Sequence, residues 1–477
     1  MTLFDLGMYM AKSMWAFSYA TASFVTLVLT GVAISGAATR NRSVNIVLCL
    51  LSNHLSELPL TIMFTDACFY TWLNVTGVFQ ESLLVRFFYY TNIITAIGLL
   101  YLFKRSLESR EVGQKFLDQI SKDRKKWIEL PGLSSPRFWQ QLLNPFHWPR
   151  DCTVYQNIPY WTQSEQLSAQ KSDGWESVVD MALDIYRPNT VQGGDDRPVL
   201  FYIHGGGWTQ GSKKLLSPLI TEMISHEWVV VSIDYRLRTK AGYPTQLVDC
   251  KRALRWVKDE IRTFGGDPSR IIVAGDSAGG QMAAMISLTP NIAEYQPGFE
   301  VVDTTVQGCL GLSAVLNIVD LENYSHHDAR ARFIKDIAKR DGSPESAENL
   351  KFLTEHSPRF RIKEAGVPFM IVHGDIDTLT PVQHARDFVR EYQISCTAPI
   401  SYLEVPGGHH CFHVISSPRS WYVTIAAAEW LNYHFDASGR QNTQSIDNDG
   451  SQSGSIGGSA TKRKLHVHDI VEWGWNT

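Results

Sequence analysis

The chain has 477 residues, and at roughly 100–200 residues per domain this length allows two or three domains. Apolar residues make up 44% of the chain and charged residues 19%, a balance typical of a protein with a large buried core. The formal net charge is −4 and no long basic run is present, which argues against nucleic acid as a partner. The seven cysteines are scattered and form no CxxC pair, which argues against a disulfide framework and a zinc ribbon.

Residues 16–38 carry no charged side chain and are long enough, as a helix, to cross the roughly 30 Å hydrocarbon core of a membrane. A cleaved signal peptide is the competing interpretation, but its apolar region is shorter, at about 7–15 residues. We therefore expect a retained membrane helix. It opens a predicted transmembrane region at residues 1–104.

Two further apolar stretches, 46–64 and 87–103, are predicted as the second and third spans. The first of them is interrupted by His54, Glu57 and Pro59, and ionisable groups inside a membrane are costly. An interfacial segment is therefore the alternative interpretation of 46–64. The stretch at 87–103 is short but free of charge.

The orientation of this region is predicted from its charges. The loop expected at 65–85 has no Lys or Arg and holds a glycosylation sequon that begins at Asn74, whereas Lys104 and Arg105 follow the third stretch. Cytoplasmic loops are enriched in Lys and Arg. With three spans, the sequence predicts an integral protein of an internal membrane such as the endoplasmic reticulum, with everything after residue 104 in the cytosol. Without the second span, the predicted side is reversed.

The rest of the chain divides into three predicted parts. Residues 105–150 form a charged, partly helical connector, and residues 151–435 form the main folded domain, on which the candidate chemical motifs lie. Residues 436–477 form a tail rich in Gly, Ser, Asn and Gln, which has too few apolar residues to order itself.

Short apolar runs alternate with helical stretches from residue 151 onward, a pattern that predicts an α/β fold with a mostly parallel sheet flanked by helices. The expected strands lie within 183–188, 198–207, 228–237, 270–280, 306–314, 369–375 and 400–407. A helix is expected at 249–265, closed by its final glycine.

The strongest chemical signal is a G-x-S-x-G motif that runs from Gly275 to Gly279 and centres on Ser277. An apolar strand precedes it and a helical stretch follows it, which is the context of a serine nucleophile on a tight strand-to-helix turn. Small residues are needed on both sides because the backbone is crowded there. We therefore predict Ser277 as a nucleophile, with Gly275 and Gly279 as supporting residues.

A second signal is the sequence HGGGW, which begins at His204 and ends an expected strand. Acyl transfer produces a tetrahedral oxyanion that needs fixed N–H donors. We expect the amides of Gly206 and Gly207, together with that of Ala278, to form the oxyanion hole. His204 and Gly205 are predicted to support this loop.

A base and an acid are expected later in the chain, since the order on this kind of sheet is Ser, then Asp or Glu, then His. Two carboxylates, Asp375 and Asp377, follow one expected strand, and the histidines His409, His410 and His413 follow the next. A histidine there would take the serine proton while a carboxylate fixes its tautomer. Spacing alone does not choose among these residues.

The motifs HGGGW, GDSAGG, HGDIDTLTP and PGGHHCF, in this order, resemble the hormone-sensitive-lipase and carboxylesterase branch of the α/β-hydrolases. The sequence is most similar to those of the mycobacterial lipase/esterase group, and the resemblance covers about residues 144–434. The resemblance implies the α/β-hydrolase fold after an N-terminal membrane region. It also implies carboxylic-ester hydrolysis with no cofactor and no metal.

The family patterns also choose the acid and the base. The pattern H-G-x-x-D-x-x-x-P implies Asp377 rather than Asp375, and G-x-x-H-x-F implies His410 rather than His409. The chain departs from the family nearby, because a cysteine stands at 411 where Gly or Ala is usual and a histidine at 413 where Asp is common.

We thus expect a membrane-anchored serine hydrolase that cleaves a small-molecule or lipid ester, favouring lipophilic ones, through an acyl-Ser277 intermediate. An amidase or formamidase with the same triad is the first alternative, and a catalytically inactive interaction protein of the same fold is the second. Residues 313–365 contain a charged helical stretch that could form a lid over the site.

Overall fold

The structure of the chain is a computed structural model that describes residues 3–39, 41–121, 128–143, 149–167, 181–364 and 366–435. The predicted tail at 436–477 lies outside the described residues, as do parts of the predicted connector. Everything described belongs to one compact unit that ends at Phe435.

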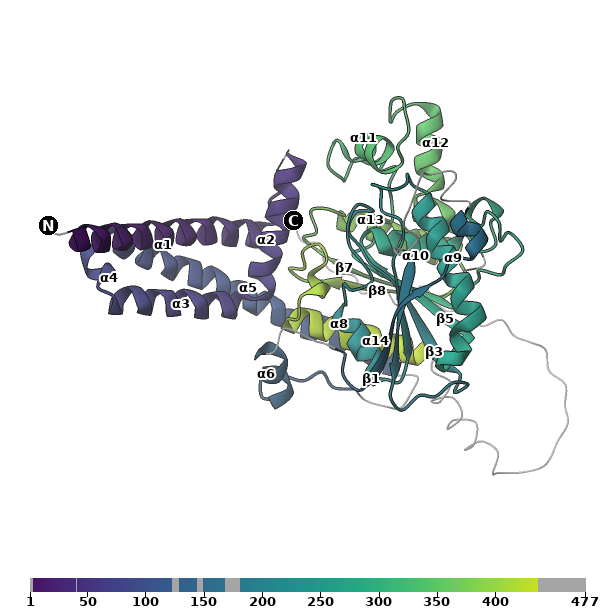
Figure 1. Cartoon of the computed structure of the whole chain (residues 1–477), viewed down its shortest axis with the longest axis horizontal. Helices are drawn as coiled ribbons and strands as arrows, with labels where there is room; N and C mark the ends of the chain where they lie inside the picture. Colours follow the sequence, from purple (N-terminus) through teal and green to yellow (C-terminus); the bar gives the residue numbers. More distant parts are fainter. Residues whose placement is uncertain are drawn as a thin grey trace. The chain divides into compact units, whose positions relative to one another are not determined.

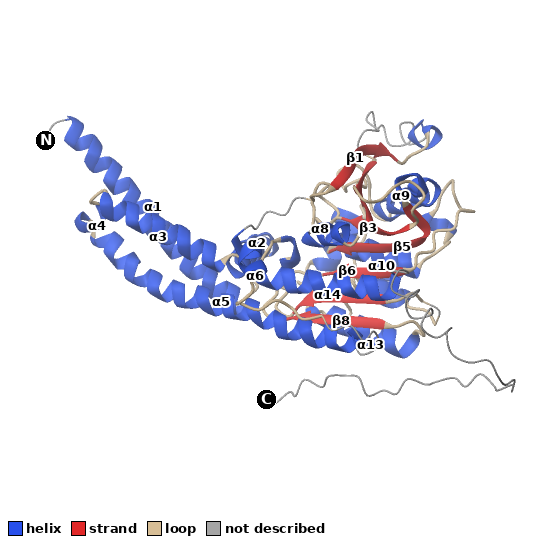
Figure 2. Cartoon of the chain, turned by 90° about the horizontal axis from the view of Figure 1, so that it is seen from below, coloured by secondary structure: helices blue, strands red, loops and turns tan. Residues whose placement is uncertain are grey.

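The first part of the chain is helical (Figure 1). Its helices are α1 (Leu3–Ser35), α2 (Arg42–Glu57), α3 (Pro59–Val75), α4 (Val78–Glu81) and α5 (Leu83–Ser121). The helices α1, α3 and the first half of α5 lie side by side in both views (Figures 1 and 2). By length and composition, α1 and α5 could each cross a membrane, and α2 with α3 passes the same test only as a pair bent by 86°.

The predicted second span at 46–64 is not one straight helix. The chain breaks at Leu58, and Pro59 begins α3 at a position where its missing N–H leaves no helical hydrogen bond unmade. The bundle therefore contains α3, while α2 turns against the loops of the α/β domain. The loop expected at 65–85 is also largely helical.

Inside the bundle, polar side chains link three helices. The Asn92 amide of α5 donates to the Tyr19 hydroxyl (2.9 Å), to the Ser23 hydroxyl (3.0 Å) and to the Asp66 carboxylate (2.9 Å). Such bonds hold apolar helices in register where lipid supplies no hydrophobic driving force.

An eight-stranded sheet forms the centre of the α/β domain, in the order β1-β2-β4-β3-β5-β6-β7-β8. Its strands are β1 (Cys152–Pro159), β2 (Ala182–Pro188), β3 (Arg197–Ile203), β4 (Val229–Ile233), β5 (Gly266–Asp276), β6 (Gly308–Leu312), β7 (Phe369–Gly374) and β8 (Ile400–Val405). The pairs β1–β2 and β2–β4 are antiparallel, and all the others are parallel. The mostly parallel sheet expected from the sequence is confirmed, with β1 as an additional strand.

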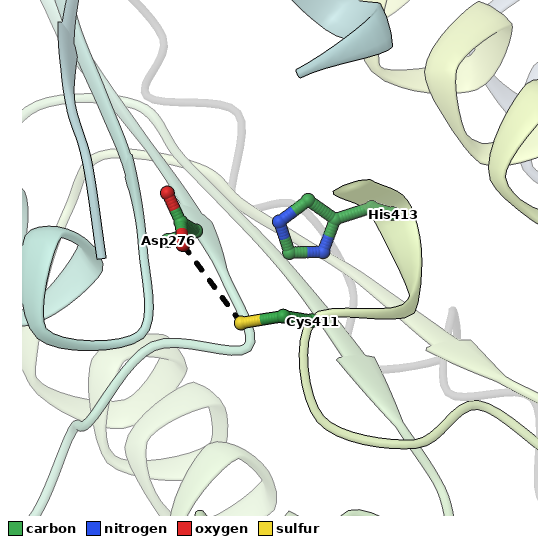
Figure 3. Close-up of side chains that lie close together, drawn as sticks. All are labelled: Asp276, Cys411 and His413. Atoms are coloured by element: carbon green, nitrogen blue, oxygen red, sulfur yellow. Dashed lines mark hydrogen bonds between the residues drawn. The ribbon is translucent and has the colours of Figure 1, made fainter. Parts of the chain in front are cut away.

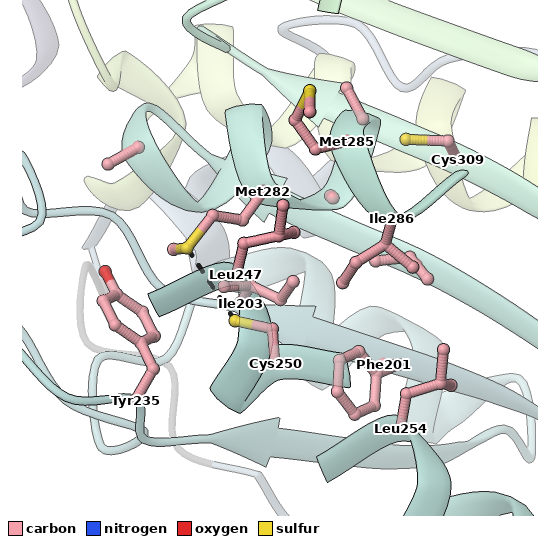
Figure 4. Packing of buried hydrophobic residues seen from close by; sticks show 14 of the residues in the cluster. Phe201, Ile203, Tyr235, Leu247, Cys250, Leu254, Met282, Met285, Ile286 and Cys309 are labelled. Carbon is pink, nitrogen blue, oxygen red and sulfur yellow. Dashed lines mark hydrogen bonds between the residues drawn. The ribbon is translucent and has the colours of Figure 1, made fainter. Parts of the chain in front are cut away.

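Helices cover both faces of this sheet (Figure 2). One face packs on α9 (Thr245–Glu260), α10 (Ala278–Leu288) and α13 (Val382–Ser395), and Figure 4 shows part of that core, in which Phe201 and Ile203 of β3 lie near Leu254 and Met282. The other face packs on α8 (Pro218–Ser225), α14 (Pro418–Phe435) and the end of α5. The remaining helices are α6 (Pro136–Leu143), α11 (Ala329–Arg332), α12 (Ala347–Glu355), a π-helix (Phe333–Ile337) and 3-10 helices at Ile261–Phe264, Ala293–Tyr295, Pro358–Arg361 and Phe412–Val414.

The helix α5 joins the two parts of the molecule. It extends well past the predicted third span, to Ser121, so that the start of the predicted connector is the second half of this helix. That half packs against α14, and Phe116 enters the core under the sheet. The bundle is thus continuous with the α/β domain.

Candidate active site

The serine of the G-x-S-x-G motif lies on a sharp turn between β5 and α10. Ser277 has φ 52° and ψ −117°, a strained conformation for a residue with a side chain. Its backbone N–H donates to the Leu312 carbonyl (3.0 Å) and its own carbonyl accepts from Gln281 (3.0 Å), so neighbouring elements hold the turn. Small neighbours are essential, because a Cβ on Gly279 would lie 2.1 Å from the Ile203 carbonyl oxygen.

Three of the predicted site residues form a continuous chain of hydrogen bonds. The Ser277 hydroxyl donates to Nε2 of His410 at 2.9 Å, and Nδ1 of His410 donates to Oδ2 of Asp377 at 2.8 Å. A carboxylate can only accept, so this contact assigns the ring proton to Nδ1 and leaves Nε2 free to accept. All three side chains are buried, with His410 the most exposed residue of the three at 9%.

The charges of this chain of bonds fit the acid and base roles. Burial would raise the pKa of Asp377, but attraction to His410 and hydrogen bonds from His373 and His410 outweigh burial and hold the pKa well below its usual range. Burial lowers the pKa of His410, but the Asp377 carboxylate more than compensates, so the pKa of His410 is raised overall. Asp377 is therefore an anion that stabilises an imidazolium.

The two alternative residues lie in other contacts. The Asp375 carboxylate accepts from the Gly407 amide (2.6 Å) and from Arg105 (3.3 Å). The ring of His409 points toward α1, where its Nε2 lies 3.1 Å from the Ala33 carbonyl oxygen. Neither side chain is part of the hydrogen-bonded chain that ends at Ser277.

Two site residues were not singled out from the sequence. The Thr380 hydroxyl donates to Oδ2 of Asp377 at 2.8 Å and lies 3.0 Å from Nδ1 of His410, while the Thr380 amide donates to Oδ1 of Asp377 at 2.8 Å. His373 donates from Nε2 to the Thr380 carbonyl at 2.7 Å and lies 3.4 Å from Asp377. The signal available for Thr380 was its place three residues after Asp377 in HGDIDTLTP.

The glycine loop after β3 lies beside the serine turn. The Gly205 amide donates to Oδ1 of Asp276 at 3.0 Å, which ties the loop to the residue before the nucleophile. Gly206 has φ 117°, and a Cβ there would lie 2.1 Å from the Gln210 carbonyl oxygen. Among the described residues, the amides of Gly206 and Gly207 donate no hydrogen bond within the protein. Two donors are therefore free for an oxygen of a bound molecule, next to the first amide of α10 at Ala278.

His204 supports the backbone of the glycine loop. Its ring stacks on Tyr235 at a centroid distance of 4.4 Å, and its Nδ1 lies 2.7 Å from the Gly205 carbonyl oxygen. The Tyr235 hydroxyl in turn donates to the His204 carbonyl at 3.0 Å. Buried at 1% exposure, His204 braces the backbone and does not reach the triad.

The segment predicted as a lid contacts the glycine loop. Phe333, in the π-helix of that segment, meets Trp208 edge-on with centroids 5.2 Å apart, and Tyr243 lies 5.4 Å from Phe333. These three rings are buried and belong to one hydrophobic cluster, and Trp208 directly follows Gly207. The contact gives the segment a place beside the site, whereas its motion as a lid stays a prediction.

The helix α2 bonds directly to the loops that carry the acid and the base. The Asn45 amide donates to the Thr378 carbonyl (3.3 Å), Asn53 donates to the His410 carbonyl (3.4 Å), and Ser56 donates to the Gly407 carbonyl (3.5 Å). These contacts join residues more than 330 positions apart, so no local sequence pattern predicts them. The loops that carry Asp377 and His410 are thus held in place by α2.

Comparison with known proteins finds a family model and several esterases that are similar to this chain. Residues 183–392 match the family model described as BD-FAE. The chain is 36% identical over 250 residues to the probable carboxylic ester hydrolase LipM of Mycobacterium tuberculosis, covering 52% of this chain and 57% of LipM. It is 28% identical over 222 residues to the probable isoprenylcysteine alpha-carbonyl methylesterase ICMEL1 of Arabidopsis thaliana, covering 44% of each.

Among solved structures, the chain is similar to a truncated carbohydrate esterase from gut microbiota, with a TM-score of 0.49, 19% identity and coverage of 59% of this chain and 96% of that one. The match to LipM spans little more than half the length of that relative. The predicted resemblance to mycobacterial-type esterases is confirmed, and the sheet with its flanking helices has the expected α/β-hydrolase fold.

Proposed function

We propose that the chain is a serine hydrolase of carboxylic esters, held at a membrane by its N-terminal helices. The observation that carries the proposal is the bonded series Ser277–His410–Asp377, with distances of 2.9 and 2.8 Å, on a strained serine turn. The names of two relatives, a probable carboxylic ester hydrolase and a probable methylesterase, support the same activity.

In the proposed mechanism, Oγ of Ser277 attacks the ester carbonyl while Nε2 of His410 takes its proton. The negative charge that forms on the carbonyl oxygen is held by the free amides of Gly206 and Gly207 and by that of Ala278. His410 then gives its proton to the departing alcohol, which leaves an acyl-serine. Water, deprotonated by the same ring, attacks the acyl carbon and releases the acid and Ser277.

The substrate class proposed is a lipophilic ester. The aromatic cluster of Trp208, Tyr243 and Phe333 lies next to the oxyanion loop and suits an apolar group. The contacts of α2 with the catalytic loops keep the site next to the proposed membrane bundle. Lipid esters and isoprenylcysteine methyl esters both fit this class, and amide cleavage by the same triad is the alternative that assays must separate.

The proposed topology has three passes, formed by α1, α3 and the first half of α5, with the α/β domain on the side opposite the N-terminus. The basic residues after the third pass favour a cytosolic domain. Protease treatment of sealed microsomes tests this directly: the α/β domain should be digested without detergent, and its protection would contradict the placement.

The mechanism is tested by fluorophosphonate labelling of the full chain in detergent micelles. Labelling is expected for the wild type, to be abolished in Ser277→Ala, and to be strongly slowed in His410→Gln. Ser395→Ala, which changes an exposed serine at the end of α13, is the matched control and should label like the wild type. Equal labelling of wild type and Ser277→Ala would end the proposal.

The substrate class is then tested with p-nitrophenyl esters of increasing chain length, an isoprenylcysteine methyl ester and a p-nitroanilide. The proposal expects kcat/KM to rise from short to longer esters and the anilide to be cleaved least. A preference for the anilide would replace the esterase by an amidase.

A further inference from the structure

A second cluster of side chains lies next to the triad. Asp276 precedes the nucleophile in the chain, Cys411 follows the base, and His413 lies two residues further on. One ligand atom from each of these three lies within 4.8 Å of the others, and Sγ of Cys411 is 3.8 Å from Oδ2 of Asp276. Figure 3 shows the His413 ring facing both the carboxylate and the thiol.

His413 has no partner within this environment. It is 2% exposed, yet neither ring nitrogen makes a hydrogen bond with any residue that the structure describes. The other buried histidines of the described chain each bond through at least one nitrogen. A buried polar atom without a partner costs about 1–3 kcal/mol, so two of them on one ring call for a ligand.

The carboxylate is arranged to offer one oxygen to the cluster. Oδ1 of Asp276 accepts from the Tyr202 hydroxyl (2.9 Å) and from the Gly205 amide (3.0 Å). Oδ2 has only the weak contact with the Cys411 thiol. The Asp276 side chain is thus fixed in a position from which Oδ2 faces the sulfur and the ring.

Carboxylate oxygen, thiolate sulfur and imidazole nitrogen are the ligands that zinc takes in proteins. Zinc bonds of about 2.0–2.3 Å in a tetrahedron place ligand atoms about 3.3–3.8 Å apart. The contact of 3.8 Å between sulfur and carboxylate already meets that spacing, and the ring nitrogen, which lies within 4.8 Å of both, needs to move by about 1.5 Å at most.

We propose that Asp276, Cys411 and His413 form a binding site for a zinc ion, with the fourth position open to water, and that the bound ion inhibits the hydrolase. On binding, the Cys411 thiol loses its proton to solvent and its sulfur bonds to the metal. The site changes from one negative charge to none. The inhibitory part rests on the proposed esterase function, whereas binding of the metal does not.

Inhibition follows from the position of the charge. The Asp276 carboxylate directly precedes Ser277, so it attracts the positive charge that the proposed mechanism places on the His410 ring. A bound dication neutralises the carboxylate. It also ties the residue before Ser277 to two residues that closely follow His410, so the serine turn and the histidine loop are held in one position.

Binding is tested with Co²⁺ as a spectroscopic probe on the full chain in detergent micelles, prepared free of metal. We expect a thiolate-to-cobalt charge-transfer band in the near ultraviolet that saturates at one equivalent and is displaced by Zn²⁺. The band should be lost in Cys411→Ala and weakened at least tenfold in affinity in His413→Gln. Cys68→Ser, which removes an exposed thiol, is the matched control and should keep the band.

Inhibition is tested by ester turnover with and without Zn²⁺, and the ratio is compared within each variant. Wild type and Cys68→Ser are expected to lose at least about tenfold in rate and to recover with a chelator, whereas Cys411→Ala and His413→Gln should lose less than about twofold. A cobalt band unchanged in both Cys411→Ala and His413→Gln would overturn the site. If no ester is turned over at all, the proposed function fails, but the cobalt band still decides the metal site.

Discussion

Replacing Glu57 by Gln removes one half of a buried ion pair that ties α2 to the α/β domain. The Glu57 carboxylate contacts the Arg419 guanidinium and accepts from the Ser417 hydroxyl at 2.5 Å, and the Glu57 and Arg419 side chains are both 0% exposed. Arg419 also donates from Nε to the Pro406 carbonyl at 3.1 Å, in the loop that leads to His410. The pair therefore connects the bundle to the base.

The magnitude follows from burial. In Glu57→Gln the Arg419 charge stays buried without a counter-charge, which costs about 3–5 kcal/mol. At about 2 °C per kcal/mol for a large domain, the midpoint of thermal unfolding should fall by roughly 6–10 °C. The double variant Glu57→Leu/Arg419→Met, which removes both charges, should recover most of this loss.

The assay is thermal unfolding of the full chain in detergent micelles, followed by residual fluorophosphonate labelling. Arg105→Gln is the matched control, because Arg105 pairs with Asp375 at 3.3 Å with both side chains more than a quarter exposed. That half-exposed pair is worth about 1 kcal/mol or less. If Glu57→Gln lowers the midpoint of thermal unfolding no more than Arg105→Gln does, the reasoning is refuted. The Glu57–Arg419 pair would then not be what holds α2 in place.

Three further changes test the site itself by steady-state kinetics. Asp377→Asn should lower kcat about 10⁴-fold. Because Asp377 raises the pKa of His410 and the base must be neutral, the pH at which activity is lost on acidification should also move lower in this variant. An unchanged acidic side of the pH–rate profile would contradict the pairing of Asp377 with His410. Gly206→Ala should lower kcat about 10²–10³-fold, because its Cβ would lie 2.1 Å from a carbonyl oxygen. Gly207→Ala should lower kcat less, because its Cβ has no neighbour within 4 Å. Thr380→Val should lower kcat about tenfold with KM unchanged, because a bond of 2.8 Å to Asp377 is lost; a change in KM alone would assign it to substrate binding.

The core of the fold was predictable from the sequence because a buried parallel strand appears as a continuous apolar run. All five residues of β4 (Val229–Ile233) are buried, and so are all six of β7 (Phe369–Gly374), and both were expected. The edge strand β1 (Cys152–Pro159) was missed because most of its residues are exposed or half-buried, so it has no such run.

The helical region was predictable in content but not in its boundaries. Hydropathy detected α1 and α5, but it joined the end of α2 to the start of α3 across Pro59. Proline at the first position of a helix marks a start, and that rule places the boundary correctly. The direction in which α2 leaves the bundle depends on Glu57 meeting Arg419, a contact between residues 362 positions apart. No local pattern contains that information.

The candidate site was also predictable only in part from local sequence. Ser277 and the glycine loop stand in local motifs that encode their own backbone geometry, so their placement followed from the sequence. The choice of Asp377 over Asp375 needed the family pattern, because both carboxylates follow the same strand. Physically the two differ in where the turn after β7 points them: one toward His410 and the other toward Arg105.

The contacts of α2 suggest that the N-terminal helices do more than provide the proposed membrane attachment. In this fold the acid and the base lie on loops beyond strand ends, and such loops are the more mobile parts of a domain. Here Asn45 and Asn53 bond to backbone carbonyls next to Asp377 and at His410 itself. A bilayer that holds α1, α3 and α5 in register also fixes where α2 lies, and so the spacing of the two loops. The reaction rate should therefore respond to the lipid or detergent around the bundle even for a water-soluble ester, which needs no membrane to reach the site.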